Sequence, residues 1–123
     1  MRLIGSKDTK PEMLLRRLVH SMGYRYRLHV KDLPGKPDLV FRGRKKVIFV
    51  HGCFWHQHAN CREGRVPSSR KSYWEPKLAR NKQRDEEHLK ELKRLVWRTM
   101  VIWECQLRDP AELHYKVSTF LAP

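Results

Sequence analysis

The sequence lacks the features that would direct a chain into a membrane or stabilise it outside the cell. No apolar run among its 123 residues approaches the length that spans a bilayer, and no signal-peptide core follows Met1. It has only three cysteines, an odd count that argues against a disulfide framework. We therefore expect a cytoplasmic protein without a membrane partner, whose reduced thiols suit metal ligation.

Acidic residues are scarce as well. The chain has 27 Lys and Arg against 13 Asp and Glu, a formal net charge of +14. Such an excess in a small domain predicts a polyanionic partner, because each neutralised phosphate releases counterions. An acidic membrane surface and a basic protein without such a partner are the alternatives. Repeats, low-complexity tracts and linkers are also lacking, so the length predicts one domain over residues 1–123.

The spacing of the apolar residues switches between helical and strand periods. Thr9 can cap a first helix, which Gly23 can close. A capping-box pattern at residues 72–75 predicts the start of a second helix, and Asn81 could bend that helix. Helices are expected over residues 9–22, 72–94 and 109–121, and strands over 24–30, 38–41, 47–50 and 97–103. The two middle strands are close enough for a hairpin. This order predicts a small α/β domain with helices packed on a central sheet.

The stretch from His51 to Cys61 holds three of the seven histidines and two of the three cysteines. Together with the distant Cys105, Cys53, His58 and Cys61 form a Cys3His set, which satisfies a tetrahedral zinc site. His51 and His56 are alternatives to His58, which lies closer to Cys61 in the sequence. Four protein ligands leave no position for water, so the set predicts a structural metal. Ordinary buried thiols beside a surface histidine are the competing interpretation.

Asp38 is the best candidate for a catalytic metal ligand. It begins a strand that pairs through the hairpin with the strand ending at His51, and Mg²⁺ prefers such hard oxygen ligands. His51 and His56 flank the same loop and can titrate near neutral pH. Glu12 could reach the site if the first helix docks there. A turn residue at position 38 and a helix cap at position 12 are the simpler alternatives.

Phe54 and Trp55 form an adjacent apolar pair in a polar loop, and Trp74 follows a basic loop. Adjacent residues in a loop cannot easily both belong to a core, so one interpretation is a wedge that stacks on nucleic-acid bases. The alternative is packing over the metal site for the pair, and core anchoring for Trp74. Many Lys and Arg residues between positions 62 and 84 could follow phosphates.

Several of these segments resemble the very-short-patch repair endonucleases, the Vsr family. The matching segments are Pro34-Gly35-Lys36-Pro37-Asp38, the block from Val47 to His56, and Val101-Ile102-Trp103-Glu104-Cys105. Residues 7–12 and the helix of Trp74 match as well, in the same order. The resemblance covers nearly the entire chain, and the block ending at His56 is highly specific.

The resemblance implies a restriction-endonuclease-like fold, a central mixed β-sheet flanked by helices, with one structural zinc ion. It also implies Mg²⁺-dependent nicking of double-stranded DNA immediately 5′ of the thymine in a T·G mismatch, which arises when 5-methylcytosine deaminates. Asp38 corresponds to the metal-binding carboxylate, and the backbone carbonyl of Val50 contacts the metal. His56 corresponds to the general base, with Glu12 orienting it or a metal-bound water. His51 belongs to the same catalytic group.

The remaining correspondences concern zinc and DNA. Cys53, His58, Cys61 and Cys105 match the zinc ligands; Phe54, Trp55 and Trp74 match aromatics that intercalate beside the mismatch. Partners beyond DNA would be repair factors, and we expect a monomer, because cutting one strand requires one active site. A related, restriction-associated nuclease of different specificity and a zinc-stabilised DNA-binding module without catalysis are the alternative functions.

Overall fold

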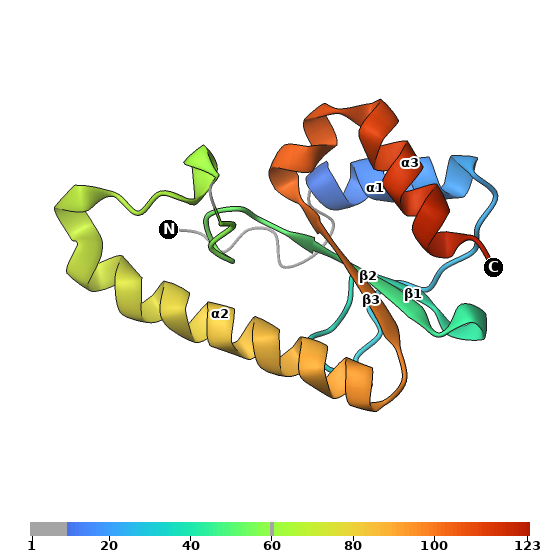
Figure 1. Ribbon diagram of the computed structural model, residues 1–123, viewed down its shortest axis with the longest axis horizontal. Helices are drawn as coiled ribbons and strands as arrows, with labels where there is room; N and C mark the ends of the chain where they lie inside the picture. The colour runs from blue at the N-terminus through green and yellow to red at the C-terminus, as the bar shows by residue number, and fades with distance from the viewer. Residues whose placement is uncertain (1–9, 60) are drawn as a thin grey trace.

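The computed structural model describes residues 10–59 and 61–123 (Figure 1). Its sheet has the order β1-β2-β3, with strands Leu39–Phe41, Lys46–His51 and Arg98–Trp103. β1 and β2 are antiparallel neighbours, as the hairpin prediction requires, whereas β2 and β3 are parallel. The connection between the parallel strands contains the longest helix, α2. The sheet is therefore mixed and the domain is α/β, as predicted.

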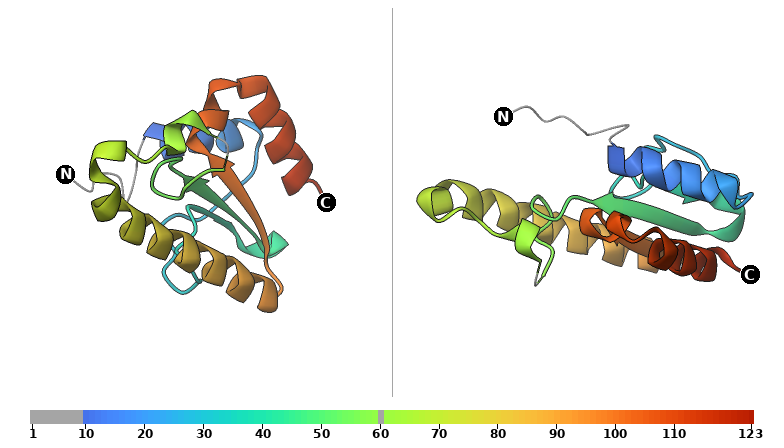
Figure 2. Two further views of the ribbon diagram at one scale, coloured as in Figure 1. Left: turned by 60° about the vertical axis from the view of Figure 1, so that its left-hand side comes forward. Right: turned by 90° about the horizontal axis from the view of Figure 1, so that it is seen from above.

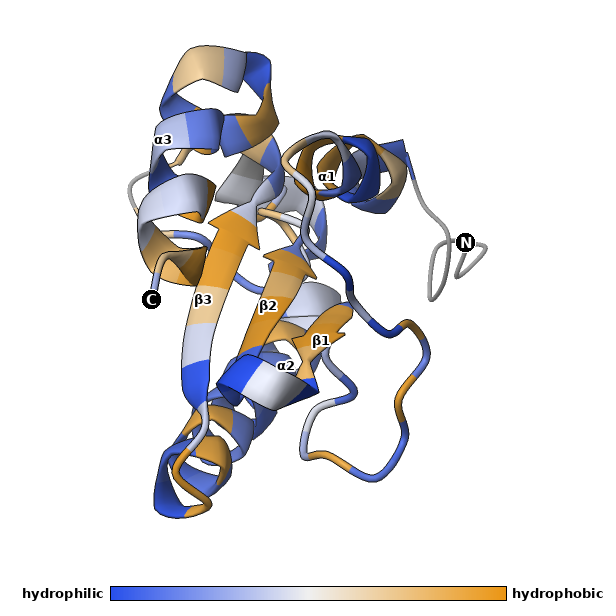
Figure 3. Ribbon diagram, turned by 90° about the vertical axis from the view of Figure 1, so that its right-hand side faces the viewer, coloured by the Kyte–Doolittle hydropathy of each residue, from blue (hydrophilic) through white to orange (hydrophobic). Residues whose placement is uncertain are grey.

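Helices cover both faces of this sheet. α1 (Lys10–Ser21) and α3 (Pro110–Leu121) lie on one face, and α2 (Lys71–Arg94) lies on the other (Figures 1 and 2). Figure 3 shows the apolar strands between these layers. Within the part of the chain that the structure describes, no helix is long and apolar enough to cross a membrane.

The alternation of side chains along the strands builds a core on each face of the sheet. Leu39, Phe41, Ile48 and Ile102 pack with the buried residues of α1 and α3. Val40, Val47 and Phe49 point to the opposite face and pack with Leu92 of α2. Nearly continuous apolar strands are what a sheet covered on both faces requires.

The strand expected over residues 24–30 is reduced to an isolated antiparallel bridge between Arg27 and Val40. The prediction of a full strand was wrong because β1 offers only three residues for pairing and His29 adopts a left-handed φ of 55°. The expected alternation of Tyr24, Tyr26, Leu28 and Val30 on one face holds in part, since the first three pack against the core of α1 and α3 whereas Val30 packs against the core on the opposite face.

The helix ends agree with the sequence in part. Asp109, where the last helix was expected to begin, caps α3, with its Oδ1 accepting a hydrogen bond from the amide of Glu112 at 3.2 Å. The cap expected at Thr9 lies outside the described residues. The capping box at residues 72–75 was wrong: α2 already begins at Lys71 and has no side-chain cap. Asn81 does not interrupt α2 either, and its side chain instead donates to the carbonyl of Trp55 at 3.4 Å.

Candidate active site and metal centre

Asp38 lies at the point where the turn before β1 meets the end of β2. Its backbone amide donates to the carbonyl of Ile48 at 3.1 Å, and its Oδ2 accepts from the amide of Val50 at 2.6 Å. A strand residue points its N–H and its C=O to the same side. The carbonyl of Val50 therefore faces the side of β2 on which Asp38 lies.

Glu12 brings a second carboxyl group to Asp38. It is buried, with 6% of its surface exposed, and Arg16 Nη2 donates to its Oε2 at 3.3 Å. Burial is the main cause that raises the pKa of Asp38 to about 7, and the charge and hydrogen bonding of Glu12 raise it further. The Val50 amide and Arg16 oppose this rise. Two carboxyl groups held this close disfavour joint ionisation, so the pair suits a divalent cation with hard oxygen ligands.

His51 and His56 stack face to face beside these carboxyl groups. Their ring centroids are 3.9 Å apart at an angle of 7°. Burial, followed by the charge of His56, lowers the pKa of His51 to about 4, although Asp85 acts in the opposite direction. His51 is therefore neutral near pH 7.

Asp85 of α2 holds His56 through a hydrogen bond between Nδ1 and Oδ2 at 2.5 Å. Because Nδ1 is engaged with the carboxylate, Nε2 is the ring nitrogen that remains to exchange a proton with another molecule. A carboxylate behind an imidazole fixes both its orientation and its tautomer, as a general base requires.

One cavity of about 220 Å³ collects these groups. Its lining includes all four residues named as catalytic from the sequence, Glu12, Asp38, His51 and His56, together with Val50. Lys36, Asp85 and His88 also line it and were not among the site residues predicted from the sequence.

A signal for Asp85 was present in the sequence. It lies seven residues from both Leu78 and Leu92, which are buried. An acidic residue at the middle of that spacing occupies the inward side of the helix. The charged helix has an irregular apolar side, and this irregularity hid the position of Asp85.

A second group of side chains forms the candidate metal centre. The ligand atoms of Cys53, His58, Cys61 and Cys105 all lie within 4.8 Å of one another. Cys105 Sγ and His58 Nδ1 are 3.5 Å apart. Tetrahedral zinc with bonds of about 2.3 Å to sulfur and about 2.0 Å to nitrogen separates those two atoms by about 3.5 Å. The Cys3His cluster can therefore hold zinc.

The surrounding loop is shaped to keep this cluster together. The amide of His58 donates to the carbonyl of Cys53 at 2.9 Å, and a Cβ added at Gly64 would approach the carbonyl oxygen of His58 to 2.9 Å. Trp103 stacks on His58 at a centroid distance of 4.2 Å. Burial raises the pKa of the Cys53 thiol to about 12, so ionisation of this thiol requires a cation such as a bound metal.

His51, His56 and Asp85 also bring ligand atoms within 4.8 Å of one another. Their geometry suits proton transfer better than metal binding. The lone pairs of an imidazole lie in the ring plane, so two stacked, nearly parallel rings do not aim at a common ion. The structure thus separates the histidines as the sequence analysis preferred, with His58 beside the thiols and the other two beside Asp38.

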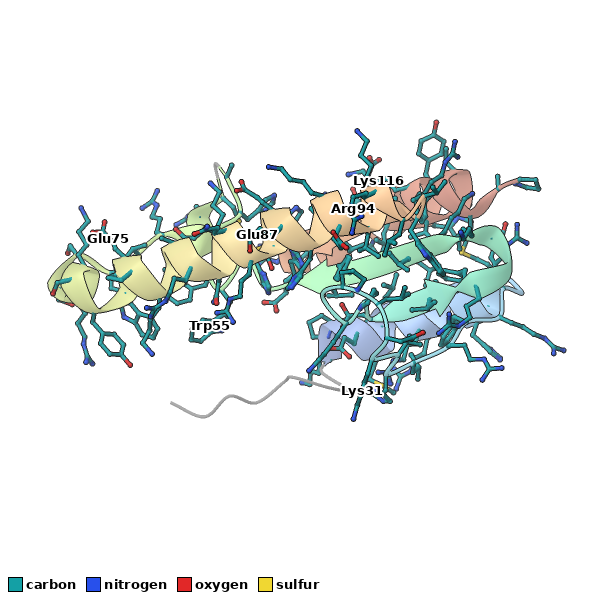
Figure 4. All side chains as sticks on the ribbon, turned by 90° about the horizontal axis from the view of Figure 1, so that it is seen from below. Lys31, Trp55, Glu75, Glu87, Arg94 and Lys116 are labelled. Atoms are coloured by element: carbon teal, nitrogen blue, oxygen red, sulfur yellow. The ribbon has the colours of Figure 1, made fainter. Side chains whose placement is uncertain are left out.

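Phe54, Trp55 and Trp74 form an aromatic cluster next to the cavity. Their ring centroids lie 5.2 to 5.5 Å apart in edge-to-face arrangements, although Trp74 comes from α2. All three side chains are only partly buried, and Figure 4 shows Trp55 projecting from the molecule beside α2. The guanidinium of Arg70 and the amine of Lys77 lie over the ring of the neighbouring Tyr73.

Comparison with solved structures identifies the class of fold. The catalytic domain of the homing endonuclease I-Bth0305I matches with a TM-score of 0.63 at 19% identity, covering 92% of this chain and 94% of that chain. The protein therefore has the restriction-endonuclease-like fold that the sequence predicted.

Comparison with known sequences identifies the family. Residues 1–63 match the family described as DNA mismatch endonuclease Vsr. The type II nicking enzyme V.XorIIP of Xanthomonas oryzae pv. oryzae is 49% identical over all of this chain and 90% of its own length. The DNA mismatch endonuclease Vsr of Escherichia coli is 40% identical over 92% of this chain and 72% of its own. The chain belongs to the Vsr family and is a DNA endonuclease.

Proposed function

We propose that this protein nicks one strand of double-stranded DNA immediately 5′ of the thymine in a T·G mismatch, in a reaction that depends on Mg²⁺, and so initiates very-short-patch repair. One observation carries the proposal: His56, fixed by Asp85, shares a cavity with Asp38, while its sequence neighbour Trp55 belongs to the aromatic cluster. Groups suited to phosphodiester hydrolysis and groups suited to unstacking bases thus occupy consecutive positions.

Asp38 and the carbonyl of Val50 would hold the magnesium ion, which would neutralise the charge that develops on the phosphate. Glu12 lies against Asp38 and would orient a water bound beside it. His56 acts as the general base: its Nε2 takes a proton from the attacking water, while Asp85 stabilises the imidazolium through Nδ1. His51, kept neutral by burial, supports the ring of His56 through the stack.

The aromatic cluster accounts for the choice of a mismatch. Phe54, Trp55 and Trp74 would insert beside the mismatched pair, and unstacking costs least where base pairing is already weak. Their edge-to-face contacts with one another leave ring surface on the outside of the cluster, which DNA bases can cover. The zinc site would hold the loop that carries two of these rings.

The excess of positive charge supports DNA as the partner, and we expect a cytoplasmic monomer that meets other repair factors at the nick. A nuclease of different DNA specificity is the second candidate, favoured by the relatives named type II nicking enzymes. A DNA-binding module without catalysis does not explain why the buried Glu12 lies against the half-buried Asp38.

The test compares cleavage of a T·G-mismatched duplex with that of a fully paired duplex of the same sequence, with Mg²⁺ present and absent. The proteins are the unmodified chain, the variant Asp38→Ala, and the matched control Asp32→Ala, whose side chain is exposed and pairs with Arg42. We expect Mg²⁺-dependent cutting of the mismatched duplex, lost only in Asp38→Ala. Equal cutting of both duplexes would exclude mismatch specificity, and no cutting by any protein would favour the binding module.

A further inference from the structure

A second cavity adjoins the active site on the side of Asp38 away from the two histidines. It measures about 180 Å³ and shares Glu12, Lys36 and Asp38 with the active-site cavity, but neither His51 nor His56 lines it. Its other walls come from Arg16 of α1 and from residues 29–31 and 37. Because the two cavities meet at Asp38, a DNA strand that runs along both would place neighbouring phosphates in them.

The rim of this second cavity carries positive charge that its walls do not compensate. Arg16 is committed to the ion pair with Glu12. Lys31 and Lys36 are exposed, and among residues 10–59 and 61–123 no carboxylate forms an ion pair with either. A cation held by Asp38 would leave these two lysines as the excess charge beside the cut.

The backbone of two lining residues is strained. His29 and Lys36 adopt left-handed φ values of 55° and 50°, which any residue with a Cβ adopts at a cost in free energy. Gly35, next to Lys36, has a φ of 78° and shows which residue type fits such a turn without that cost. Lys45, Gln57 and Val96, which do not line this cavity, adopt positive φ as well, so the strain is not specific to it.

We propose that this cavity is a phosphate subsite, in which Lys31 and Lys36 bind the DNA phosphodiester that adjoins the scissile one on the side of Asp38. The proposal rests on the proposed function, because it takes the cut strand to pass over Asp38. Lysine amines bind phosphate oxygens as mobile point charges, which suits two exposed side chains on a rim. Lys31 and Trp55 lie on the same side of the molecule in Figure 4, whereas Lys116 lies on the opposite side.

The experiment combines protein variants with single phosphate changes in a T·G-mismatched duplex. Each duplex carries one uncharged methylphosphonate in the cut strand, at either position flanking the cut. The proteins are the unmodified chain, the double variant Lys31→Gln with Lys36→Gln, and the control Lys116→Gln on α3. Circular dichroism of each variant checks that the fold is retained.

One flanking methylphosphonate is expected to slow the unmodified protein and the control about tenfold. The double variant should cut the unmodified duplex about tenfold more slowly than the unmodified protein does, and that methylphosphonate should slow it no further. The subsite would be excluded if, at both flanking positions, the slowing by the methylphosphonate and the slowing by the double substitution multiply. It would also be excluded if neither change slows cleavage.

A binding measurement separates this inference from the proposed function. The salt dependence of the dissociation constant is measured on a fully paired duplex without Mg²⁺, so it requires no cleavage. Loss of the contact with this one phosphate should lower the slope of log K against log salt concentration by about 1 in the double variant but not in Lys116→Gln. An unchanged slope overturns the subsite, whereas failure of the unmodified protein to cut T·G duplexes counts against the proposed function alone.

Discussion

Two sites share the stretch from His51 to Cys61, and they are built on opposite principles. The Cys3His cluster draws four ligand atoms within 4.8 Å of one another, where a single ion satisfies all of them. The active site instead keeps a cavity of about 220 Å³ between its groups and holds the carboxyl groups of Asp38 and Glu12 against each other. An ion bound by the first group would stabilise the loop. The second group lowers the stability of the fold, because it keeps carboxyl groups close together in a cavity.

This contrast predicts that variants of the metal centre lose stability and activity together, whereas variants of the active site lose activity alone. The largest effect is expected for Cys105→Ser, which removes the proposed zinc ligand that would join the loop to the end of β3. We expect loss of bound zinc, a fall in unfolding free energy of several kcal/mol and loss of cleavage, since structural zinc contributes directly to folding.

The measurements are metal content by atomic emission and thermal unfolding with and without a chelator. The exposed His114 on α3 provides the control His114→Ser, which should behave like the unmodified protein. A Cys105→Ser protein with full zinc content and an unchanged melting temperature would refute the assignment of this ligand.

Asp38→Asn should reduce the cleavage rate by about three orders of magnitude, because the loss of metal-assisted catalysis costs several kcal/mol. The same substitution should stabilise the metal-free protein at about pH 8. The folded-state pKa of about 7 lies above the ordinary value of 3.8, so the folded state holds the proton more tightly. Stability of the unmodified protein therefore falls as the pH rises between these two values.

The measurement is the free energy of unfolding as a function of pH in a chelator that spares zinc. Asp38→Asn should flatten the decline between about pH 4 and about pH 7. A decline of the same size in both proteins would show that Asp38 is not the source of the instability.

Asp85→Asn tests the arrangement behind the general base. An amide at this position can donate a hydrogen bond to His56 Nδ1 and so favours the wrong tautomer. We expect kcat to fall about 100-fold, KM to change little and the melting temperature to remain unchanged. Glu87→Gln, an exposed change on the same helix, is the matched control (Figure 4). A rise in KM without a fall in kcat would assign Asp85 to DNA binding.

Gly64→Ala should give the smallest effect and should act on the metal centre alone. The added Cβ would lie 2.9 Å from the carbonyl oxygen of His58, so the loop must shift. We expect a loss of about 1 to 3 kcal/mol in unfolding free energy and a matching loss of zinc affinity. Gly43→Ala has open space around its Cβ and serves as the control. Equal effects of the two substitutions would contradict the tight packing around His58.

Local spacing explains what the sequence could predict. The order of the elements, the hairpin that ends at His51 and the set of thiols with His58 all follow from residues close together in the chain or from short motifs. The contact of Asp85 with His56 does not, because it depends on how α2 crosses the sheet, although the spacing of Asp85 from Leu78 and Leu92 marks the inward side of the helix. The contact of Trp74 with Phe54 has the same origin, since no periodic pattern reports the distance between a helix and a loop.

Residues 24–30 show the limit in another way. Their alternation correctly predicted a shared face for Tyr24, Tyr26 and Leu28 but not for Val30, and it predicted a strand where one bridge forms. Side-chain burial is encoded by the pattern itself, whereas ladder formation depends on the length of the partner strand and on φ at His29.

The most direct test of the proposed function is strand-resolved cleavage of a T·G-mismatched duplex labelled on both strands, in the presence of Mg²⁺. We expect one product, from the strand that contains the thymine and with its break immediately 5′ of that base, and no product from the paired duplex. Breaks in both strands, or equal cutting of the paired duplex, would contradict it.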